Sequence, residues 1–185
     1  GDMKAYLSDK KNIFKYQKSG DYLIRGEKVK ELPKSWKLKI LGEHNRINAA
    51  CAVAVARILE IPEKLIKQTV ENFVGVAGRL ELIRTWRGIK IYNDTTSTTP
   101  EALQVALEAL GGKKNIILIM GGADKNLKIK GEVIKMIQKY CKKVILLPGT
   151  GTNKLIRSYL PDGKAGKLKA KSLMVSNLRE AIIIA

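Results

Sequence analysis

The chain has 185 residues, of which 45% are hydrophobic, so it can bury a real core and is too apolar for a disordered tail. Its 35 basic and 17 acidic residues give a net charge of +18, while two cysteines and one histidine exclude a disulfide scaffold and a multi-histidine metal site. No apolar run approaches the roughly 20 residues that span a bilayer, and no signal peptide is apparent, which predicts a soluble, cytoplasmic protein without membrane insertion.

The basic excess indicates either a solvated, lysine-rich surface or attraction to a polyanion such as nucleic acid, an anionic membrane, a nucleotide or a phosphate. The basic residues are scattered and form no tract of five or six. Aromatic residues make up only 5% of the chain, so stacking platforms for single strands are scarce. We therefore favour the solvated surface and expect no nucleic-acid partner.

The first 78 residues predict helices joined by irregular segments. Apolar side chains recur with helical spacing in three stretches, and Pro62 suits the first turn of the third. Gly75 and Gly78 then mark a linker, where domain closure would need a hinge. The predicted helices span residues 3–17, 45–60 and 63–73.

After Arg79 the pattern changes to alternating strands and helices, which is typical of an α/β fold with a mainly parallel sheet. Arg87-Gly88 is a plausible hairpin turn. Residues 116–120 and 144–147 are continuous apolar runs, which predict two central strands buried on both faces. The predicted strands span 82–85, 89–92, 116–120, 144–147 and 173–175, and the predicted helices span 100–110, 133–141, 153–160 and 177–185.

Such sheets bind ligands beyond the carboxyl ends of their strands, so the loops there are candidate sites. The segment 93–99 leaves a strand, enters a helix and reads Asn-Asp followed by five hydroxyl residues. Asp94 can accept both hydroxyls of a ribose, and hydroxyls near a helix N-terminus lie where anions are favoured. Capping by Thr98 or Thr99 explains one hydroxyl but not five, so the segment predicts a binding role.

Two glycine-containing loops follow later strands. Gly121-Gly122 would let backbone approach a ligand, and Lys125 adds a compact charge for a carboxylate or phosphate. An ordinary turn with a surface lysine is the alternative. The segment 148–152 lacks the third glycine of the dinucleotide fingerprint, which favours a simple turn and disfavours an NAD-dependent oxidoreductase.

Two earlier features also suit a nucleotide. Asn45 and Asn48 share a helix face, where two amides can read a purine edge or position a phosphate; alternatively, Asn45 is an N-cap and Asn48 an exposed first-turn residue. Arg79 lies in a glycine-flanked linker, where it can meet phosphate or remain solvated. No G-x-x-x-x-G-K-[ST] motif occurs, so the chain carries no P-loop of its own.

In chain order these motifs resemble those of the Mur ligase family of peptidoglycan synthesis. Residues 42–50 are similar to G-x-H-N-x-x-N-A-A, and residues 73–81 to F-x-G-x-x-x-R-x-E. Residues 92–98 resemble the N-D-[ST]-x-[AS]-T motif, and residues 121–125 the G-G-x-x-K motif, of the members that add D-glutamate. The resemblance is clear over roughly residues 40–150.

The resemblance implies a partial remnant of an ATPase domain over residues 1–78 and a Rossmann-like C-terminal domain over residues 79–185, truncated at its end. It implies a monomeric, ATP-dependent ligase that uses Mg²⁺ and joins D-glutamate to UDP-N-acetylmuramoyl-L-alanine through an acyl phosphate. Motif by motif, the implied ATP or ADP contacts are Asn45, Asn48, Arg79 and Asp94, and the implied D-glutamate contacts are Thr98 and Lys125.

The sequence also departs from the family pattern. Thr96 stands where the family often has Lys, and Gly78 where it often has His. The P-loop and the Mg²⁺ ligands lie upstream in the family, so we assign no catalytic residue and no metal ligand, and expect this segment alone to be inactive. A non-catalytic nucleotide- or polyanion-binding α/β module is the alternative function.

Overall fold

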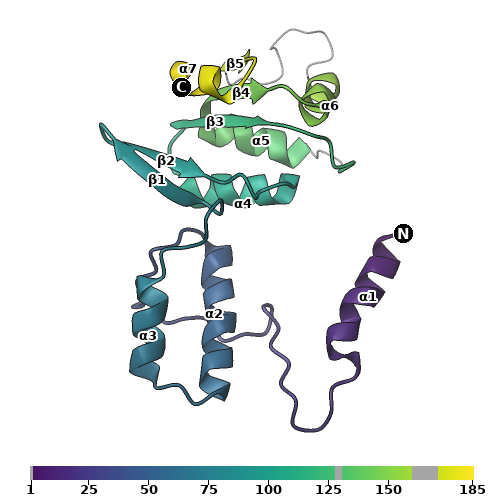
Figure 1. Cartoon of the computed structure of the whole chain (residues 1–185), viewed down its shortest axis with the longest axis vertical. Coiled ribbons are helices and arrows are strands. Elements are labelled where there is room, and N and C mark those ends of the chain that lie inside the picture. The colour runs from purple at the N-terminus through teal and green to yellow at the C-terminus, as the bar shows by residue number, and fades with distance from the viewer. Residues whose placement is uncertain (1, 128–130, 160–170) are drawn as a thin grey trace. The chain divides into compact units, whose positions relative to one another are not determined.

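The computed structural model describes residues 2–127, 131–159 and 171–185 (Figure 1). The chain divides into two compact units, which are taken here one after the other. In the described part, no helix combines the length and the apolar character needed to cross a membrane. The first unit comprises Gly1–Lys37 and Arg46–Asn72, and the second comprises Leu38–Asn45 and Phe73–Ala185.

The first unit is helical, with a small core. The guanidinium of Arg46 donates hydrogen bonds to the carbonyl oxygens of Leu32, Pro33 and Trp36, over 3.1 to 3.3 Å. Leu32 and Trp36 are buried, so these bonds fix an irregular segment that contributes apolar side chains to the core. The helices that contribute to this unit are α1 (Met3–Lys15), α2 (Glu43–Ile58) and α3 (Glu63–Asn72).

These helices match the predicted ones closely. Helix α2 begins at Glu43, two residues earlier than expected, so Asn45 lies inside its first turn. The alternative in which Asn45 is the N-cap is therefore wrong. Helix α1 ends at Lys15, two residues before the predicted end.

The second unit begins with an antiparallel hairpin. Strands β1 (Glu81–Trp86) and β2 (Ile89–Asn93) pair along their length, with a register shift between Leu82 and Arg84. The predicted turn at Arg87-Gly88 is confirmed, and both residues have positive φ, of 48° and 80°. Two positive φ values suit the right-handed twist of the flanking strands.

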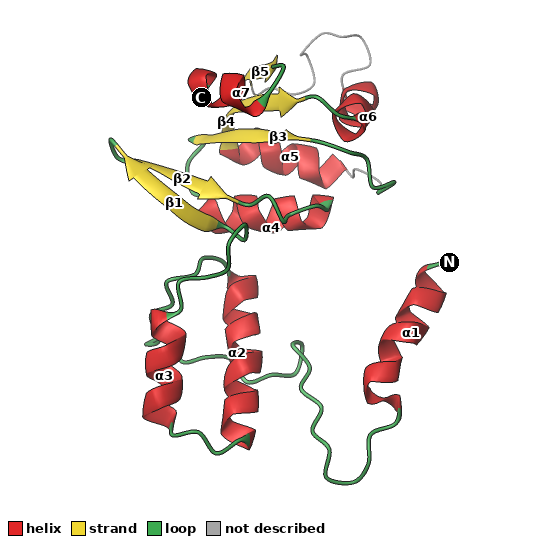
Figure 2. Cartoon of the chain, viewed as in Figure 1, coloured by secondary structure: helices red, strands yellow, loops and turns green. Residues whose placement is uncertain are grey.

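The rest of the second unit is a three-layer α/β arrangement (Figure 2). Its three described strands are parallel and lie in the order β3-β4-β5. This confirms the predicted α/β fold with a mainly parallel sheet. The strands are β3 (Ile116–Gly121), β4 (Cys141–Leu147) and β5 (Lys171–Met174), and the helices are α4 (Pro100–Leu110), α5 (Gly131–Tyr140), α6 (Thr150–Tyr159) and α7 (Leu178–Ile184).

Alternation along β4 divides the core between the two faces of the sheet. Val144 and Leu146 pack in the larger cluster, to which α4, α5 and α6 contribute buried side chains. Ile145 points the other way and packs with Val175 and with Ala181 of α7. Both faces of β4 are therefore covered, as its continuous apolar sequence predicts.

The prediction that two strands are central is only half right. Strand β4 is central, but β3 lies at one edge of the described sheet, and residues 116–120 are half-buried rather than buried. Strand β4 also begins earlier than predicted, because α5 ends at Tyr140 and the chain enters β4 at Cys141 without an intervening residue. Helix α6 begins at Thr150 rather than 153, and the end of its predicted span, at residue 160, lies outside the described residues.

Candidate functional site

The linker and the loop after β2 are joined by hydrogen bonds to carboxylates. We call residues 78–81 and 93–96 the linker cluster. Glu81 Oε2 accepts hydrogen bonds from the backbone N–H of Gly78 (2.9 Å) and from Asn93 Nδ2 (3.2 Å). Asp94 Oδ1 accepts one from the backbone N–H of Leu80 (2.9 Å). Both carboxylates therefore contact neutral donors, and neither forms a salt bridge within the described residues.

Thr96 completes this cluster from the other side. Its hydroxyl donates to the carbonyl oxygen of Gly78 over 2.6 Å, and its backbone N–H donates to the same oxygen over 3.1 Å. Gly78 has a φ of 73°, a conformation that glycine adopts readily. The residues on either side of Arg79 are thus both held, whereas its own side chain is exposed and has no ion-pair partner among the residues that the structure describes.

Arg79 lines a cavity of about 170 Å³ that lies wholly within the second unit. The polar side chains that line it include three cations, and no carboxylate is among the described residues of its wall. With three cations and no carboxylate among its described lining residues, the cavity favours an anion with an apolar or aromatic part. Its polar and aromatic lining residues are Lys39, Asn45, Arg79, Lys90 and Tyr92.

The structure brings some of the predicted nucleotide contacts together. Asn45 and Arg79 line the same cavity, and Asp94 adjoins it through its bond to Leu80, another lining residue. Asn45 Nδ2 also donates to the carbonyl oxygen of Leu41 over 2.7 Å. Asn48 lies one turn further along α2, in the first unit, so no common site with the others is described.

Only one of the two carboxylate oxygens of Asp94 is used in the linker cluster. Its Oδ1 atom is engaged by Leu80, whereas Oδ2 has no hydrogen-bond partner within the described ranges. The side chain is half-buried. It retains acceptor capacity for a ligand hydroxyl, as a ribose contact requires.

The segments that follow β3 and β4 are in close backbone contact with each other. We call residues 121–126 and 149–154 the strand-end cluster. The backbone N–H of Gly151 donates to the carbonyl oxygen of Gly122 over 2.9 Å. A Cβ at Gly149 would overlap that same oxygen, and one at Gly121 would overlap the carbonyl oxygen of Leu147. The approach of the chain after β4 to the chain after β3 therefore explains Gly149, and the close pairing of β3 with β4 explains Gly121.

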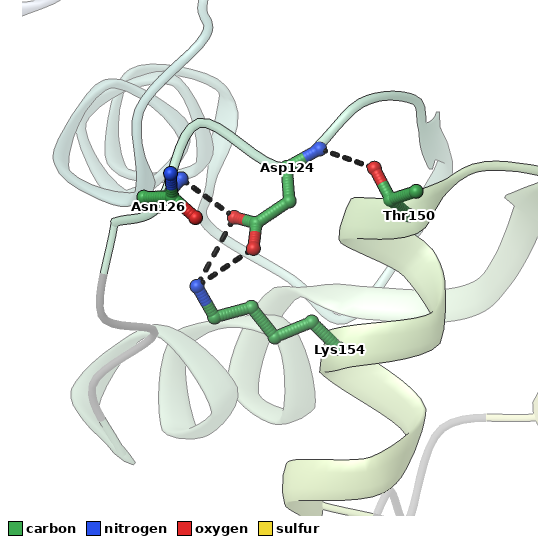
Figure 3. Close-up of polar contacts among 4 residues, drawn as sticks. All are labelled: Asp124, Asn126, Thr150 and Lys154. Atoms are coloured by element: carbon green, nitrogen blue, oxygen red, sulfur yellow. Dashed lines mark hydrogen bonds and ion pairs between the residues drawn. The ribbon is translucent and has the colours of Figure 1, made fainter.

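An ion pair joins the loop after β3 to helix α6 (Figure 3). Lys154 Nζ lies 2.9 Å from Asp124 Oδ2 and 3.1 Å from Oδ1. The backbone N–H of Asp124 donates to Thr150 Oγ1 over 2.8 Å, and that of Asn126 donates to Asp124 Oδ1 over 2.9 Å. The hydrogen bonds from Lys154 hold the pKa of the Asp124 carboxyl below its ordinary value, because they stabilise its charged form.

The sequence did not point to Asp124, Thr150 or Lys154. Asp124 and Lys154 are 30 residues apart, on consecutive strand–loop–helix units, so no short spacing links them. The available signal was the glycines in both loops, which are typical of segments that approach each other closely.

The two predicted D-glutamate contacts lie on separate loops. Lys125 is exposed between Asp124 and Asn126, and no ion pair to it is found in the described part of the chain. Thr98 is exposed just before α4, where Thr99 is the N-cap, since its Oγ1 accepts from Ala102 N over 3.2 Å. Figure 2 shows the start of α4 and the loop after β3 toward the same end of the second unit.

The described residues offer little for metal binding or covalent chemistry. They contain no group of three or more His, Cys, Asp or Glu side chains that could hold a metal ion. Cys141 is fully buried, and burial raises the pKa of its thiol to about 11, so it is not a ready nucleophile.

Comparisons with known proteins give the same family by two routes, a family match and a similar relative. Residues 78–185 match the family described as Mur ligase, glutamate ligase domain. The chain is 34% identical over 167 residues to the UDP-N-acetylmuramoylalanine–D-glutamate ligase of Caldanaerobacter subterraneus subsp. tengcongensis, covering 90% of this chain and 35% of that protein.

Solved structures show the same fold. The UDP-N-acetylmuramate-alanine ligase of Thermotoga maritima matches 80% of this chain and 33% of its own with a TM-score of 0.61 at 21% identity. The folylpolyglutamate synthase of Mycobacterium tuberculosis, complexed with ADP and AMPPCP, matches 80% of this chain and 34% of its own with a TM-score of 0.57 at 17% identity. The chain therefore spans about a third of the length of each of these proteins.

Proposed function

The chain belongs to the Mur ligase family, and from this we propose that it is the C-terminal part of an ATP-dependent ligase that adds D-glutamate to UDP-N-acetylmuramoyl-L-alanine. The relative that matches 90% of the chain is a UDP-N-acetylmuramoylalanine–D-glutamate ligase, which supports D-glutamate as the amino acid. In this proposal residues 1–78 are the tail of a central ATPase domain and residues 79–185 the domain that closes over the substrates. The complete protein would act in the cytoplasm as a monomer.

The proposed reaction has two steps. The γ-phosphoryl group of ATP passes to the carboxylate of UDP-N-acetylmuramoyl-L-alanine, which gives an acyl phosphate and ADP. The amine of D-glutamate then attacks the acyl carbon, loses a proton, and expels inorganic phosphate. Both steps depend on positioning and on the stabilisation of phosphate charge rather than on a nucleophile of the protein.

The observation that carries the proposal is the arginine of the linker cluster. The backbone on both sides of Arg79 is fixed by Glu81, Asp94 and Thr96, while its guanidinium stays unpaired within the described residues, in the wall of a cationic cavity. A positioned guanidinium of this kind suits the phosphates of a nucleotide, which it can meet with two parallel hydrogen bonds.

Other residues would complete the nucleotide contacts. Asp94 Oδ2 would accept a ribose hydroxyl, and the amides of Asn45 and Asn48 would contact the base or the phosphates. The complex of a folylpolyglutamate synthase of similar fold with ADP and AMPPCP supports a nucleotide as the ligand. We assign no Mg²⁺ ligand to this segment and derive no step through that ion.

Lys125 and Thr98 would bind D-glutamate. A lysine ammonium is a compact charge that pairs with a carboxylate, and a threonine hydroxyl can donate to one. Both side chains are exposed, so both are accessible to a substrate.

A second candidate function is a nucleotide- or polyanion-binding module without catalysis. The cationic cavity and the net charge of +18 favour it, because both attract any polyanion. For a complete protein with its upstream part, the ligase predicts ATP-dependent addition of D-glutamate, whereas the module predicts binding without catalysis.

The test is Arg79→Ala in the complete ligase, with Arg84→Ala as the matched control, since Arg84 is an exposed arginine on β1 outside the cavity. A hydrogen bond to a charged group is worth about 1.5–3 kcal/mol, so Arg79→Ala should lower kcat/KM for ATP by roughly ten- to a hundredfold. The control should stay within about twofold of the unaltered enzyme.

Two results would count against the ligase. Near-normal ATP kinetics in Arg79→Ala would show that Arg79 does not contribute to binding the phosphates of ATP. Binding of inorganic polyphosphate by this 185-residue chain as tightly as ATP, with no dependence on Arg79, would favour the non-catalytic module instead.

A further inference from the structure

We propose that Lys154 is a positioning residue: through Asp124, it holds the loop that presents Lys125 to a carboxylate of the substrate. The inference rests on the proposed function, in which Lys125 binds D-glutamate. Lys154 itself is on helix α6 and is not proposed to touch the substrate.

The first argument is that both neighbours of Lys125 are fixed. Asp124 is held at two points, its backbone N–H by Thr150 and its carboxylate by Lys154 (Figure 3). Asn126 adopts a φ of 58°, and its backbone N–H is held by the Asp124 carboxylate. The carboxylate therefore connects Lys154 to the backbone immediately after Lys125.

The second argument is that the anchor of this contact is rigid. Lys154 is followed in α6 by Leu155, which is 3% exposed and belongs to the larger core cluster. Thr152, also buried, donates its hydroxyl to the carbonyl oxygen of Leu147 over 2.7 Å. A lysine that extends from this anchored turn can hold a loop in one place.

The third argument concerns charge. Asp124 is adjacent to Lys125 in the sequence, and an unpaired carboxylate there would attract the ammonium or repel an anionic substrate. Lys154 compensates that carboxylate, with both of its oxygens within 3.1 Å of Nζ. Of the two ammonium groups, the one on Lys125 then remains available to an anion.

Loss of the ion pair between Lys154 and Asp124 should lower the affinity for substrate more than the free energy of unfolding. The side chains of Lys154 and Asp124 are 33% and 25% exposed, and ion pairs that reach solvent contribute little to folding. A small displacement of a binding group, in contrast, can reduce reactivity strongly.

The experiment is Lys154→Met in the complete ligase. The KM for D-glutamate should rise about five- to tenfold, less than on direct loss of the ammonium in Lys125→Ala, while the KM for ATP changes less than about twofold. Lys154→Arg should restore part of the affinity, since a guanidinium can still pair with Asp124. The matched control is Arg157→Met, which removes an exposed cation from the same helix.

A double-mutant cycle separates positioning from general electrostatics. If Lys154 acts through Asp124, then Asp124→Asn combined with Lys154→Met should raise the KM for D-glutamate no further than either change alone. Faster hydrogen exchange of the Asp124 and Asn126 amides in Lys154→Met, measured in this 185-residue chain, should accompany the change in KM.

The outcomes separate this inference from the proposed function. Unchanged D-glutamate KM in Lys125→Ala would overturn the assigned substrate contact and the inference with it. A raised KM in Lys125→Ala but not in Lys154→Met, or additive effects in the cycle, would overturn the inference alone. An equal rise in the KM for ATP and D-glutamate would show a structural role only and would also overturn it.

Discussion

The linker cluster and the strand-end cluster each hold a segment that carries one exposed cation, but they do so by different interactions. Around Arg79, the carboxylates of Glu81 and Asp94 accept hydrogen bonds from neutral N–H donors. Around Lys125, the carboxylate of Asp124 forms an ion pair with Lys154. The close backbone contacts differ too: a Cβ at Gly149 would overlap the backbone oxygen of Gly122, whereas a Cβ at Gly78 would lie nearest to side-chain atoms of Thr96 and Thr95.

The difference shows how a protein can fix a cation without neutralising it. In the linker cluster, the groups that donate hydrogen bonds to the carboxylates carry no charge, so dissolved salt screens these contacts little. In the strand-end cluster, a second lysine takes up the carboxylate, so the contact is screened by salt and is lost when the carboxylate is protonated. The linker cluster should therefore tolerate added salt better than the strand-end cluster, and it should be more sensitive to loss of the Thr96 hydroxyl.

The largest effect is expected for Gly149→Ala, which tests the backbone contact of the strand-end cluster. Its Cβ would overlap the carbonyl oxygen of Gly122, a backbone atom that cannot rotate away. We expect a loss of about 3 kcal/mol or more in the free energy of unfolding of this chain, measured by chemical denaturation. The control is Gly112→Ala, where a Cβ meets open space and the change should stay within about 0.5 kcal/mol.

Gly78→Ala should cost less, which sharpens the comparison. The φ of 73° is unfavourable for alanine, but the two tight contacts of the new Cβ would be with side-chain atoms, Thr96 Cγ2 at 3.0 Å and Thr95 Oγ1 at 3.3 Å, and the backbone nitrogen of Thr96 would lie at an ordinary 3.8 Å. We expect a loss of about 1–2 kcal/mol by the same denaturation measurement. A loss as large as that of Gly149→Ala would contradict the distinction between the two clusters.

Thr96→Val tests the hydroxyl of the linker cluster. It keeps the shape of the side chain but removes the hydrogen bond to the carbonyl oxygen of Gly78, so we expect a loss of about 1 kcal/mol in unfolding free energy. Thr95→Val is the control, since the Thr95 hydroxyl donates no hydrogen bond among the described residues. Equal losses in the two variants would show that the Gly78 contact contributes nothing specific.

The smallest effect concerns the titration of Asp124. Its pKa lies below the ordinary value, chiefly through the hydrogen bond from Lys154, so the contribution of the pair is present above the unfolded pKa and is lost as pH falls through the folded pKa. NMR titration of the carboxyl carbon should show that pKa rise in Lys154→Met and, more weakly, in about 1 M salt. No rise in Lys154→Met would mean that the ion pair does not form in solution.

Much of the fold was predictable from the sequence because burial leaves a clear pattern. A strand covered on both faces needs apolar side chains at every position, and residues 144–147 in β4 follow that rule. The same rule placed β3 at the centre, whereas it lies at one edge of the described sheet. An apolar run shows that a strand is sheltered, but it does not reveal the order of strands in the sheet.

The site was predictable where local motifs exist. Asn45 and Arg79 stood out by their motifs, and both line the cavity. Asp124 and Lys154 did not, because their contact depends on how the β3 and β4 loops meet. Thr96 was noted as one of five consecutive hydroxyl residues and as a departure from the family pattern, and its bond to Gly78 gives that departure a structural meaning in this chain.

The direct passage from α5 to β4 has a consequence for chain length. With no residue between Tyr140 and Cys141, an insertion at this point has no loop in which to be absorbed. Inside β4, one added residue would exchange the two faces of the strand, sending Ile145 toward α5 and Val144 toward α7. Homologous sequences should therefore keep the length of this junction constant.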